Sequence, residues 1–559
     1  MKEEKKKKKT KNNFQKETEI NKKDLIVYEI YVKSFKDSND DGVGDINGIS
    51  QKLLYLKNLG VNCIWLTPIF KSPQFDNGYD ISNYYQIDPL FGNMEDFLNL
   101  IKKAKKYNIL IMLDMVLNHT STQHNWFKKA IEGKEKYQNY YFFKNGNSKN
   151  NPPTKWKSKF GGNAWEYVPK LDKWYLHLFS PQQADVNWNN KEVRREIYKI
   201  INFWIDNGVN GFRFDVINLV SKPDDFSNKK YKKDNYKNYT DGKKIHLFLQ
   251  KLRNSYYDKK NIFTVGEFSS TNLKDFSKYT NENNSELDMG FSFFHLKVDY
   301  KNGNKWVDKK PNLKKFKKEI IKWQKYQQKN RGWVANFLSN HDQPRHISRF
   351  GDDKNYHFES ATAFATLYIL LRGTPFIFNG EEIGQTNLYN NDISEFRDIE
   401  SKNSYYKFIN ERKNKEEALK IINQKSRDNG RSPFAWNNKK YFGFSKSDPW
   451  ILYKNPYKVT LENDLKNKEK SIFLYYQKII KLRKENIVFK DGLFFSHNKK
   501  KELFIYKRIF NNKEYLVVIN LTNKYVKYKR KSTKIILNNY KNEKSLNYLN
   551  PYQAIVFEI

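Results

Sequence analysis

Three acidic residues stand at the ends of apolar, strand-like runs of the sequence: Asp215, Glu267 and Asp342. Two carboxyl groups on either side of a substrate can hydrolyse a glycosidic bond, because an ionised one attacks or stabilises the oxocarbenium-like centre while a protonated one delivers H⁺ to the leaving oxygen. A third carboxylate can raise the pKa of the acid through like-charge repulsion. The sequence therefore indicates carboxylate-based hydrolysis, provided that the three acids meet.

Basic and polar residues accompany these acids. Arg213 precedes Asp215 by two positions, His341 adjoins Asp342, and Asp114 and His119 follow another apolar run. Any one such acid alone is more often a helix cap or a surface ion-pair partner. Three of them at strand ends, with an arginine and a histidine beside them, favour a catalytic centre.

The elements that must position these residues follow a repeating pattern of short apolar runs and amphipathic stretches, which is typical of βα units around a parallel sheet. The expected strands lie within 24–31, 61–68, 109–114, 211–216, 262–267, 286–293, 333–342 and 375–382. The expected helices include 49–59, 94–106, 193–207, 243–251 and 316–328. The pattern predicts an α/β protein, a (β/α)8 TIM barrel, whose chemistry belongs at the carboxyl ends of its strands.

Interruptions of this pattern predict the domain organisation. Residues 24–118 and 184–486 form the catalytic barrel, the loop-rich 119–183 is a subdomain inserted after strand 3, and 487–559 is a C-terminal antiparallel β-sandwich domain. Residues 1–23 are a lysine-rich leader, which we expect to be disordered. The leader lacks the apolar core of about 7 to 15 residues that a signal peptide needs.

Composition limits the possible partners. Hydrophobic residues make up 38% and aromatic residues 16%, so the chain is folded. The 103 Lys and Arg against 62 Asp and Glu leave a net charge of +41, but the lysines are spread along the chain and no nucleic-acid-binding motif accompanies them. No run reaches the roughly 18 apolar residues of a membrane span, and Cys63 is the only cysteine. We expect a cytoplasmic, monomeric protein that acts on a small molecule, without nucleic acid or membrane partners.

At the acidic strand ends the chain resembles the α-amylase superfamily, glycoside hydrolase family 13. The similar segments are DMVLNH at 114–119, GFRFDVIN at 211–218, TVGE at 264–267 and SNHDQPR at 339–345. The resemblance implies that Asp215 is the nucleophile, Glu267 the general acid/base and Asp342 the transition-state stabiliser of a double displacement that retains anomeric configuration. No cofactor is implied for catalysis.

The same resemblance implies a set of sugar-binding residues. His119, Arg213 and His341 would hold the glucose in subsite −1, the subsite whose sugar forms the intermediate. Arg431 would pair with Asp76 at the closed end of an exo-acting pocket. Three aromatic residues would contact the sugar, although ordinary core filling is the alternative for each: Tyr79, Phe160 and Phe179.

The loop DSNDDGVGD at 37–45 alternates oxygen-bearing side chains around a glycine, a pattern that suits Ca²⁺. It resembles the calcium loop of the oligosaccharide-cleaving members of the family. The implied ligands of a structural ion are Asp37, Asn39, Asp41, the carbonyl of Val43, and Asp45. A metal-free, hydrogen-bonded Asx-turn is the alternative.

Longer segments narrow the expected substrate. Val216 follows the nucleophile, as in relatives that cleave linkages other than α-1,4, and several segments are most similar to the phosphotrehalases, which split trehalose 6-phosphate into glucose and glucose 6-phosphate. These segments are 156–167, 183–188, 239–249, 266–271 and 286–303. Oligo-1,6-glucosidases share the acids, the calcium loop and Val216, and are the alternative. A noncatalytic carbohydrate-binding or transporter-accessory homologue is a third possibility, but it predicts the loss of a catalytic acid.

A phosphorylated sugar in subsite +1, the leaving-group subsite, needs fixed cationic donors. The predicted candidates follow the fourth and sixth strands: Lys222, His295, Lys297 and Lys305.

Overall fold

The computed structural model describes residues 20–559 except 147–150, 225, 227–234, 257–261, 285, 455–457, 498–499, 530–533 and 542–546. Residues 1–19 of the predicted leader lie outside the described residues. Lys23, the last residue of that leader, forms an ion pair with Asp491 (2.6 Å). In the described part of the chain, no helix combines the length and the apolarity that a bilayer crossing requires.

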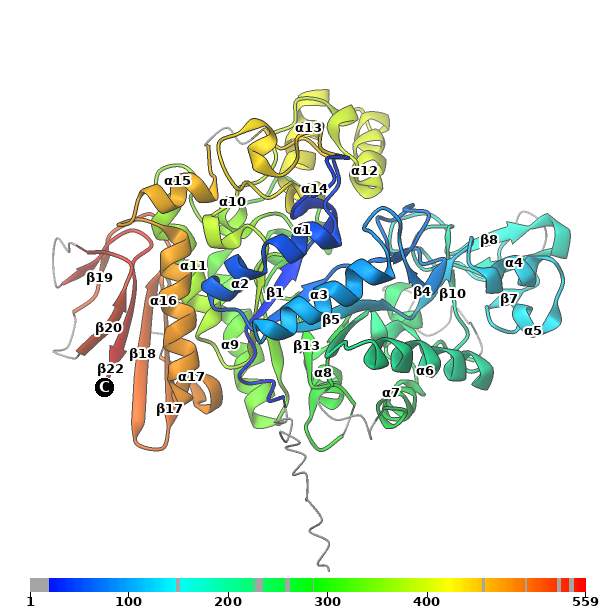
Figure 1. Ribbon diagram of the computed structural model, residues 1–559, viewed down its shortest axis with the longest axis horizontal. Helices are drawn as coiled ribbons and strands as arrows, with labels where there is room; N and C mark the ends of the chain where they lie inside the picture. Colours follow the sequence, from blue (N-terminus) through cyan, green and yellow to red (C-terminus); the bar gives the residue numbers. More distant parts are fainter. Residues whose placement is uncertain are drawn as a thin grey trace, which may run out of the picture.

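The centre of the molecule is a closed parallel barrel with the strand order β1-β15-β14-β13-β12-β11-β5-β2 (Figure 1). Each of the eight expected apolar runs supplies one strand, so the (β/α)8 barrel is confirmed. The strands are β1 (Val27–Ile30), β2 (Cys63–Leu66), β5 (Leu110–Val116), β11 (Gly211–Asp215), β12 (Phe263–Glu267), β13 (Met289–Phe291), β14 (Val334–Asn336) and β15 (Thr374–Phe378). Nearly every one of these strand residues is buried, as expected of strands covered on both faces.

Amphipathic helices cover the outside of the barrel. They include α2 (Leu53–Leu59), α3 (Met94–Lys106), α6 (Lys191–Asp206), α7 (Ile245–Asn254), α8 (Leu273–Thr280) and α9 (Leu313–Lys329). A capping box at α3, in which Asn93 and Asp96 bond each other's backbone N–H groups, fixes its start. Helix α11 (His357–Ile369) is almost wholly buried because α16 (Ile472–Glu485) and the C-terminal sheet both pack against it.

An insertion after β5 projects from the barrel, at the right in Figure 1. Its base is a ribbon in which β6 (His119–Ser121) pairs antiparallel with β10 (Gln183–Asp185). Farther out, β7 (Phe143–Lys144), β9 (Lys173–Leu176) and β8 (Trp165–Val168) form a small sheet. The insertion packs through the buried rings of Trp156 and Trp165.

The C-terminal unit is an antiparallel sheet with the order β16-β17-β18-β22-β20. Its strands are β16 (Leu493–Ser496), β17 (Leu503–Phe510), β18 (Lys513–Asn520), β20 (Lys534–Asn538) and β22 (Ala554–Glu558). One face contacts α11 through Tyr506, whose hydroxyl donates to the Leu367 carbonyl (3.2 Å). On the other face, Val526 and Leu549, from the two-stranded sheet of β19 (Val526–Lys527) and β21 (Tyr548–Leu549), pack against Ile555.

Candidate active site

Two of the three predicted acids terminate neighbouring strands. Asp215 is the last residue of β11 and Glu267 the last residue of β12, and these strands pair in parallel. Arg213 lies two residues before Asp215, so both side chains point to the same side of β11. The Arg213 guanidinium donates to Asp215 (Nη1 to Oδ1, 2.7 Å) and, through Nη2, to Glu267. One cation therefore holds the two carboxyl groups side by side.

Asp342 lies in the loop after β14 and joins the same network through His341. The Nε2 atom of His341 lies 3.5 Å from Asp342 Oδ2 and 2.7 Å from the Tyr79 hydroxyl. That hydroxyl donates to Asp114 Oδ2 (2.9 Å), and Asp114 Oδ1 accepts from Arg213 Nη1 (2.7 Å). A continuous set of polar contacts thus connects Asp342 with the other two acids. We call the three acids, Asp215, Glu267 and Asp342, the carboxylate site.

The acids are more accessible than the groups beneath them. Side-chain exposure is 10% for Asp215, 15% for Glu267 and 32% for Asp342, against 1% for Arg213 and 0% for His341. The carboxyl groups can therefore meet a substrate, whereas the arginine and the histidine support them from within the barrel.

Charge and burial set the ionisation of this site. Burial raises the pKa of Asp342, but His341, Arg427 and Arg431 outweigh it and hold that pKa well below its usual range. Burial lowers the pKa of His341 to about 3, and nearby arginines oppose its protonation as well. Asp342 is therefore ionised throughout the physiological range.

The predicted sugar-binding residues surround the acids. His119 Nε2 lies 3.0 Å from the Tyr79 carbonyl, and the rings of His119 and Phe179 are 5.2 Å apart. Phe160 packs edge-on against Phe179 (5.6 Å). The Tyr79 ring stacks on His341, with the two centroids 5.3 Å apart. The structure thus brings these five residues together.

The predicted ion pair of Arg431 with Asp76 does not form in the described structure, and Arg431 acts on Asp76 only at longer range: burial raises the pKa of Asp76, and Arg427 and Arg431 oppose that rise. Arg431 Nη2 instead bonds Asp342 Oδ1 (2.8 Å), and the cation beside Asp76 is Arg427 (3.4 Å). Arg427 is the N-cap of the short helix α14 (Asp428–Arg431) and Arg431 is its last residue, and a spacing of four residues places them on one face. Sequence reasoning missed Arg427, although the RDNGR spacing contains that signal. Arg427 also bonds Asp398 (2.8 Å) and lies over the Phe160 ring (5.0 Å).

Val216, directly after Asp215, has a left-handed backbone conformation (φ 35°, ψ 40°). A β-branched residue is a genuine outlier there, and such strain, of about 1 to 3 kcal/mol, is typically stored at functional sites. The turn lets the chain leave β11 sharply while Asp215 still points into the carboxylate site.

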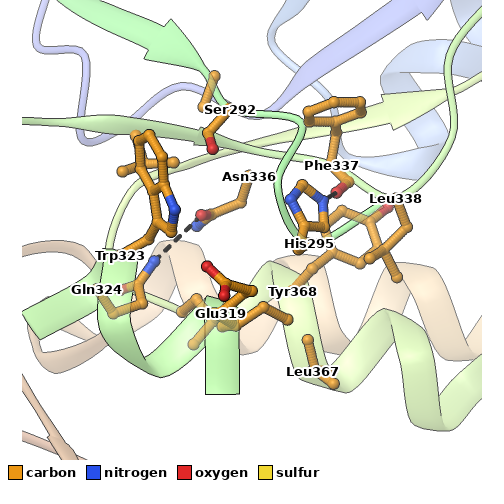
Figure 2. A pocket seen from close by; sticks show the side chains of 14 residues that line it. Ser292, His295, Glu319, Trp323, Gln324, Asn336, Phe337, Leu338, Leu367 and Tyr368 are labelled. Atoms are coloured by element: carbon orange, nitrogen blue, oxygen red, sulfur yellow. Dashed lines mark hydrogen bonds between the residues drawn. The ribbon is translucent and has the colours of Figure 1, made fainter. Parts of the chain in front are cut away.

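The four predicted phosphate contacts occupy different surroundings. Lys222 has no exposed surface and is enclosed by Asp185 (2.6 Å) and Asn118 (2.6 Å). His295 is held by the Phe337 carbonyl (2.9 Å) and lines a cavity of about 40 Å³ with Trp323 (Figure 2). The prediction is corrected for both residues, because the Lys222 ammonium is already paired within a buried cluster and the His295 imidazole is already bonded to a backbone carbonyl.

The other two candidates are more accessible. Lys297 is half-buried, with its ammonium 5.4 Å from the Phe294 ring. Lys305 bonds Glu400 (2.6 Å), which lies 3.9 Å from Arg427, itself a neighbour of Asp342. Lys305 is thus connected to Asp342 through Glu400 and Arg427.

In the loop 37–45, hydrogen bonds occupy the side-chain oxygen atoms of four predicted calcium ligands: Asp37, Asn39, Asp41 and Asp45. Asp37 accepts from the backbone N–H groups of Asp40 (2.7 Å) and Gly42 (2.9 Å). Asp45 caps α1 (Ile46–Gln51) through Gly48 N–H (2.7 Å). This is the Asx-turn arrangement, and within the described ranges no three His, Cys, Asp or Glu side chains are grouped to hold a metal. The donors are nevertheless the hard oxygens that Ca²⁺ prefers.

Comparisons with known proteins agree with this geometry. Residues 29–492 match the family described as "Alpha amylase, catalytic domain". The trehalose-6-phosphate hydrolase of Bacillus subtilis is 42% identical over 550 residues, which cover 96% of this chain and 98% of that protein. The oligo-1,6-glucosidase of Bacillus cereus is 39% identical, with coverages of 96% and 99%. The crystal structure of trehalose-6-phosphate hydrolase from Bacillus licheniformis superposes with a TM-score of 0.91 at 42% identity and covers 96% of this chain and 99% of its own.

Proposed function

The chain belongs to the α-amylase family of glycosidases, and from this premise we propose that it hydrolyses trehalose 6-phosphate to glucose and glucose 6-phosphate with retention of configuration. The observation that carries the chemistry is the shared guanidinium of Arg213, which bonds both Asp215 and Glu267. A retaining mechanism needs two carboxyl groups that are close together, about 5 to 5.5 Å apart, one on each side of the scissile bond.

Each acid has a distinct step. The Asp215 carboxylate attacks the anomeric carbon of the glucose in subsite −1, while Glu267 transfers its proton to the oxygen of the departing glucose 6-phosphate. In the second step Glu267 takes a proton from water, and the resulting oxygen nucleophile displaces Asp215. Asp342, held ionised by its cationic neighbours, stabilises the positive charge that develops on the sugar in both transition states.

Two buried groups support an exo-acting subsite −1. Asp76 is 5% exposed. Arg431 is fully buried, and its Nη1 atom is a donor with no hydrogen-bond partner in the described structure. Through Nη2, Arg431 bonds Asp342 (2.8 Å) and so helps to position an acid that faces the substrate. These contacts would surround an unmodified terminal glucose, which leaves the phosphate to subsite +1.

The experiment that tests the function compares kcat/KM for trehalose 6-phosphate, trehalose and isomaltose, with the released glucose measured. The proposal predicts a preference of at least about 10²-fold for trehalose 6-phosphate over trehalose, because charge-assisted hydrogen bonds to the phosphate contribute about 1.5 to 3 kcal/mol each. Efficient hydrolysis of isomaltose without that preference favours the second candidate, an oligo-1,6-glucosidase, which the 39% identity to the Bacillus cereus enzyme supports.

Lys305→Ala tests the phosphate contact. Because Lys305 is connected to Asp342 through Glu400 and Arg427, we expect its loss to raise KM for trehalose 6-phosphate about 10-fold, the equivalent of one charge-assisted hydrogen bond. KM for an uncharged aryl α-glucoside should stay within about twofold, and Lys297→Ala should act in the same direction. Lys309→Ala, at an exposed lysine four residues further on, is the matched control. Equal losses on both substrates remove the residue from the phosphate site.

We also propose that the loop 37–45 binds Ca²⁺ as a structural ion, since its side chains offer a set of hard oxygen donors. Millimolar Ca²⁺ should raise the Tm relative to EDTA, because an ion that binds only the folded state stabilises it by mass action, by about 2.7 kcal/mol at 100 times Kd. Asp41→Ala should abolish this shift. A Tm that does not respond to Ca²⁺ leaves the loop as an Asx-turn.

We place this activity in the cytoplasm. Cys63 is the only cysteine and is fully buried, which suits a reducing compartment. The proposed substrate is a small sugar phosphate, and the proposal requires no macromolecular partner.

A further inference from the structure

Glu29 is a buried acid that the mechanism above does not use. It lies on β1 and is 1% exposed. Its Oε1 atom is 2.6 Å from His341 Nδ1 and 3.2 Å from the His341 backbone N–H, which donates to it. Glu29 and His341 are 312 positions apart in the sequence, so only the closure of the barrel brings them together.

The other ring nitrogen of His341 faces the reaction. Nε2 lies 3.5 Å from Asp342 Oδ2 and 2.7 Å from the Tyr79 hydroxyl. Asp342 is ionised, so a bare lone pair on Nε2 would face the carboxylate and repel it. A hydrogen on Nε2 instead allows His341 to donate toward Asp342 and Tyr79. The tautomer of this ring therefore affects the position of an acid in the carboxylate site.

The contact on the Nδ1 side determines that tautomer. With one hydrogen on Nε2, a neutral imidazole has a bare Nδ1, and the 2.6 Å contact to Glu29 then needs a second hydrogen between the two atoms. That hydrogen can sit on Glu29 or on Nδ1. Both placements bind the same number of protons, and in both Nε2 remains a donor.

We propose that Glu29 is a positioning residue that shares one proton with His341 and so keeps His341 Nε2 as a donor toward Asp342 and Tyr79. The inference rests on the proposed glycosidase function. The inference adds to the proposed mechanism a residue, Glu29, that does not touch the substrate and acts through His341.

The charges around Glu29 agree with a shared proton. Burial raises the pKa of Glu29 well above its usual value, the His341 N–H and Arg213 act against this shift, and Asp114 and Asp342 add to it. Burial also lowers the pKa of His341. Asp114, whose pKa burial raises as well, bonds both Arg213 and Tyr79. A neutral Glu29–His341 pair adds no net charge to a site that already holds several charged side chains.

The sign of the pH effect follows from this arrangement. When alkaline pH removes the shared proton, the Glu29 carboxylate draws the remaining hydrogen to Nδ1. Nε2 then loses its hydrogen and faces Asp342 with a lone pair, so turnover falls. A glutamine at position 29 does not titrate and can donate its amide N–H to Nδ1, at the loss of the bond that Oε1 accepts from the His341 backbone N–H. The Glu29→Gln variant should therefore lose less activity than the wild type as the pH rises.

The test uses the full chain and 4-nitrophenyl α-glucoside, whose lack of a phosphate removes substrate titration from the comparison. Glu29→Leu should lower kcat about 10²-fold, a loss typical of a misplaced catalytic group, and Glu29→Gln should restore most of it. The ratio of kcat for Glu29→Gln to kcat for the wild type should rise between pH 7 and 10. Effects of pH that do not depend on residue 29 are common to both proteins and cancel in this ratio.

Two results overturn the inference: Glu29→Gln as impaired as Glu29→Leu, or a ratio that stays constant to pH 10. A measurement of Tm will show whether Glu29→Leu folds. If it does not fold, the pH dependence of the kcat ratio between Glu29→Gln and the wild type tests the inference alone. Wild-type protein that hydrolyses neither trehalose 6-phosphate nor the aryl glucoside contradicts the proposed function instead, so the two failures are distinguishable.

Discussion

Asp215→Ala is expected to lose at least about 10⁴-fold of kcat, the scale seen when a catalytic nucleophile is removed. Azide should then restore turnover of 4-nitrophenyl α-glucoside, because the shortened side chain leaves space for a small anion on the face from which Asp215 attacks. One displacement replaces two, so the product should be the β-glucosyl azide, with inverted configuration. The anomeric coupling constant in the proton NMR spectrum of the product measures this directly.

The matched control is Asp224→Asn. Asp224 lies on the same connection after β11, but its side chain is 72% exposed and pairs with Lys244 (3.0 Å). This variant should keep wild-type activity, since an isolated surface ion pair contributes little. An azide product of α configuration from Asp215→Ala contradicts the assignment. Residual hydrolysis above about a hundredth of the wild-type rate, measured without azide, contradicts it as well, because the loss of a nucleophile should lower the rate far more than 100-fold.

The barrel and its acids could be predicted because both are encoded locally. Each strand is a short run of buried apolar residues, and Asp215 and Glu267 directly end two such runs. The carboxyl ends of parallel strands share one end of the barrel, so strand order alone brings the acids near each other. The run 286–293, in which acidic and glycine residues interrupt the apolar ones, still supplies β13, which pairs with β12 on one side and β14 on the other.

The partners of each side chain could not be predicted in the same way. Arg427 and Arg431 are four residues apart on one helical face, and which of them reaches Asp76 depends on rotamers and on Asp398, a residue from another segment. Likewise, no local pattern links Glu29 to His341. Such contacts depend on the packing of side chains that are distant in the sequence.

The phosphate contacts were the least predictable part of the site. Lysines are abundant along the chain, so position after a strand could not separate a ligand from a surface residue. Lys222 illustrates the failure: it follows β11, as predicted, but a fully buried ion pair with Asp185 holds it. Burial of an ammonium group requires such a partner, and that partner lies on β10, in the inserted subdomain.

Replacement of Glu267 should separate the two catalytic steps. In Glu267→Ala, hydrolysis of trehalose 6-phosphate should fall about 10³- to 10⁴-fold, because the departing sugar oxygen needs a proton and general acid catalysis contributes about 10²- to 10⁴-fold. With 4-nitrophenyl α-glucoside the first step should fall far less, since 4-nitrophenolate leaves without protonation. A burst of 4-nitrophenol followed by slow turnover is the expected time course, because the second step lacks its base.

Azide distinguishes this variant from Asp215→Ala by stereochemistry. Asp215 still forms the covalent intermediate in Glu267→Ala, so azide attack is the second displacement and should give the α-glucosyl azide, with retained configuration. Glu411→Gln, at an exposed glutamate that pairs loosely with Lys407 (3.8 Å), is the control and should behave as the wild type. If both acid variants give the same azide anomer, the two carboxyl groups bonded to Arg213 do not have the separate roles that their positions on β11 and β12 imply.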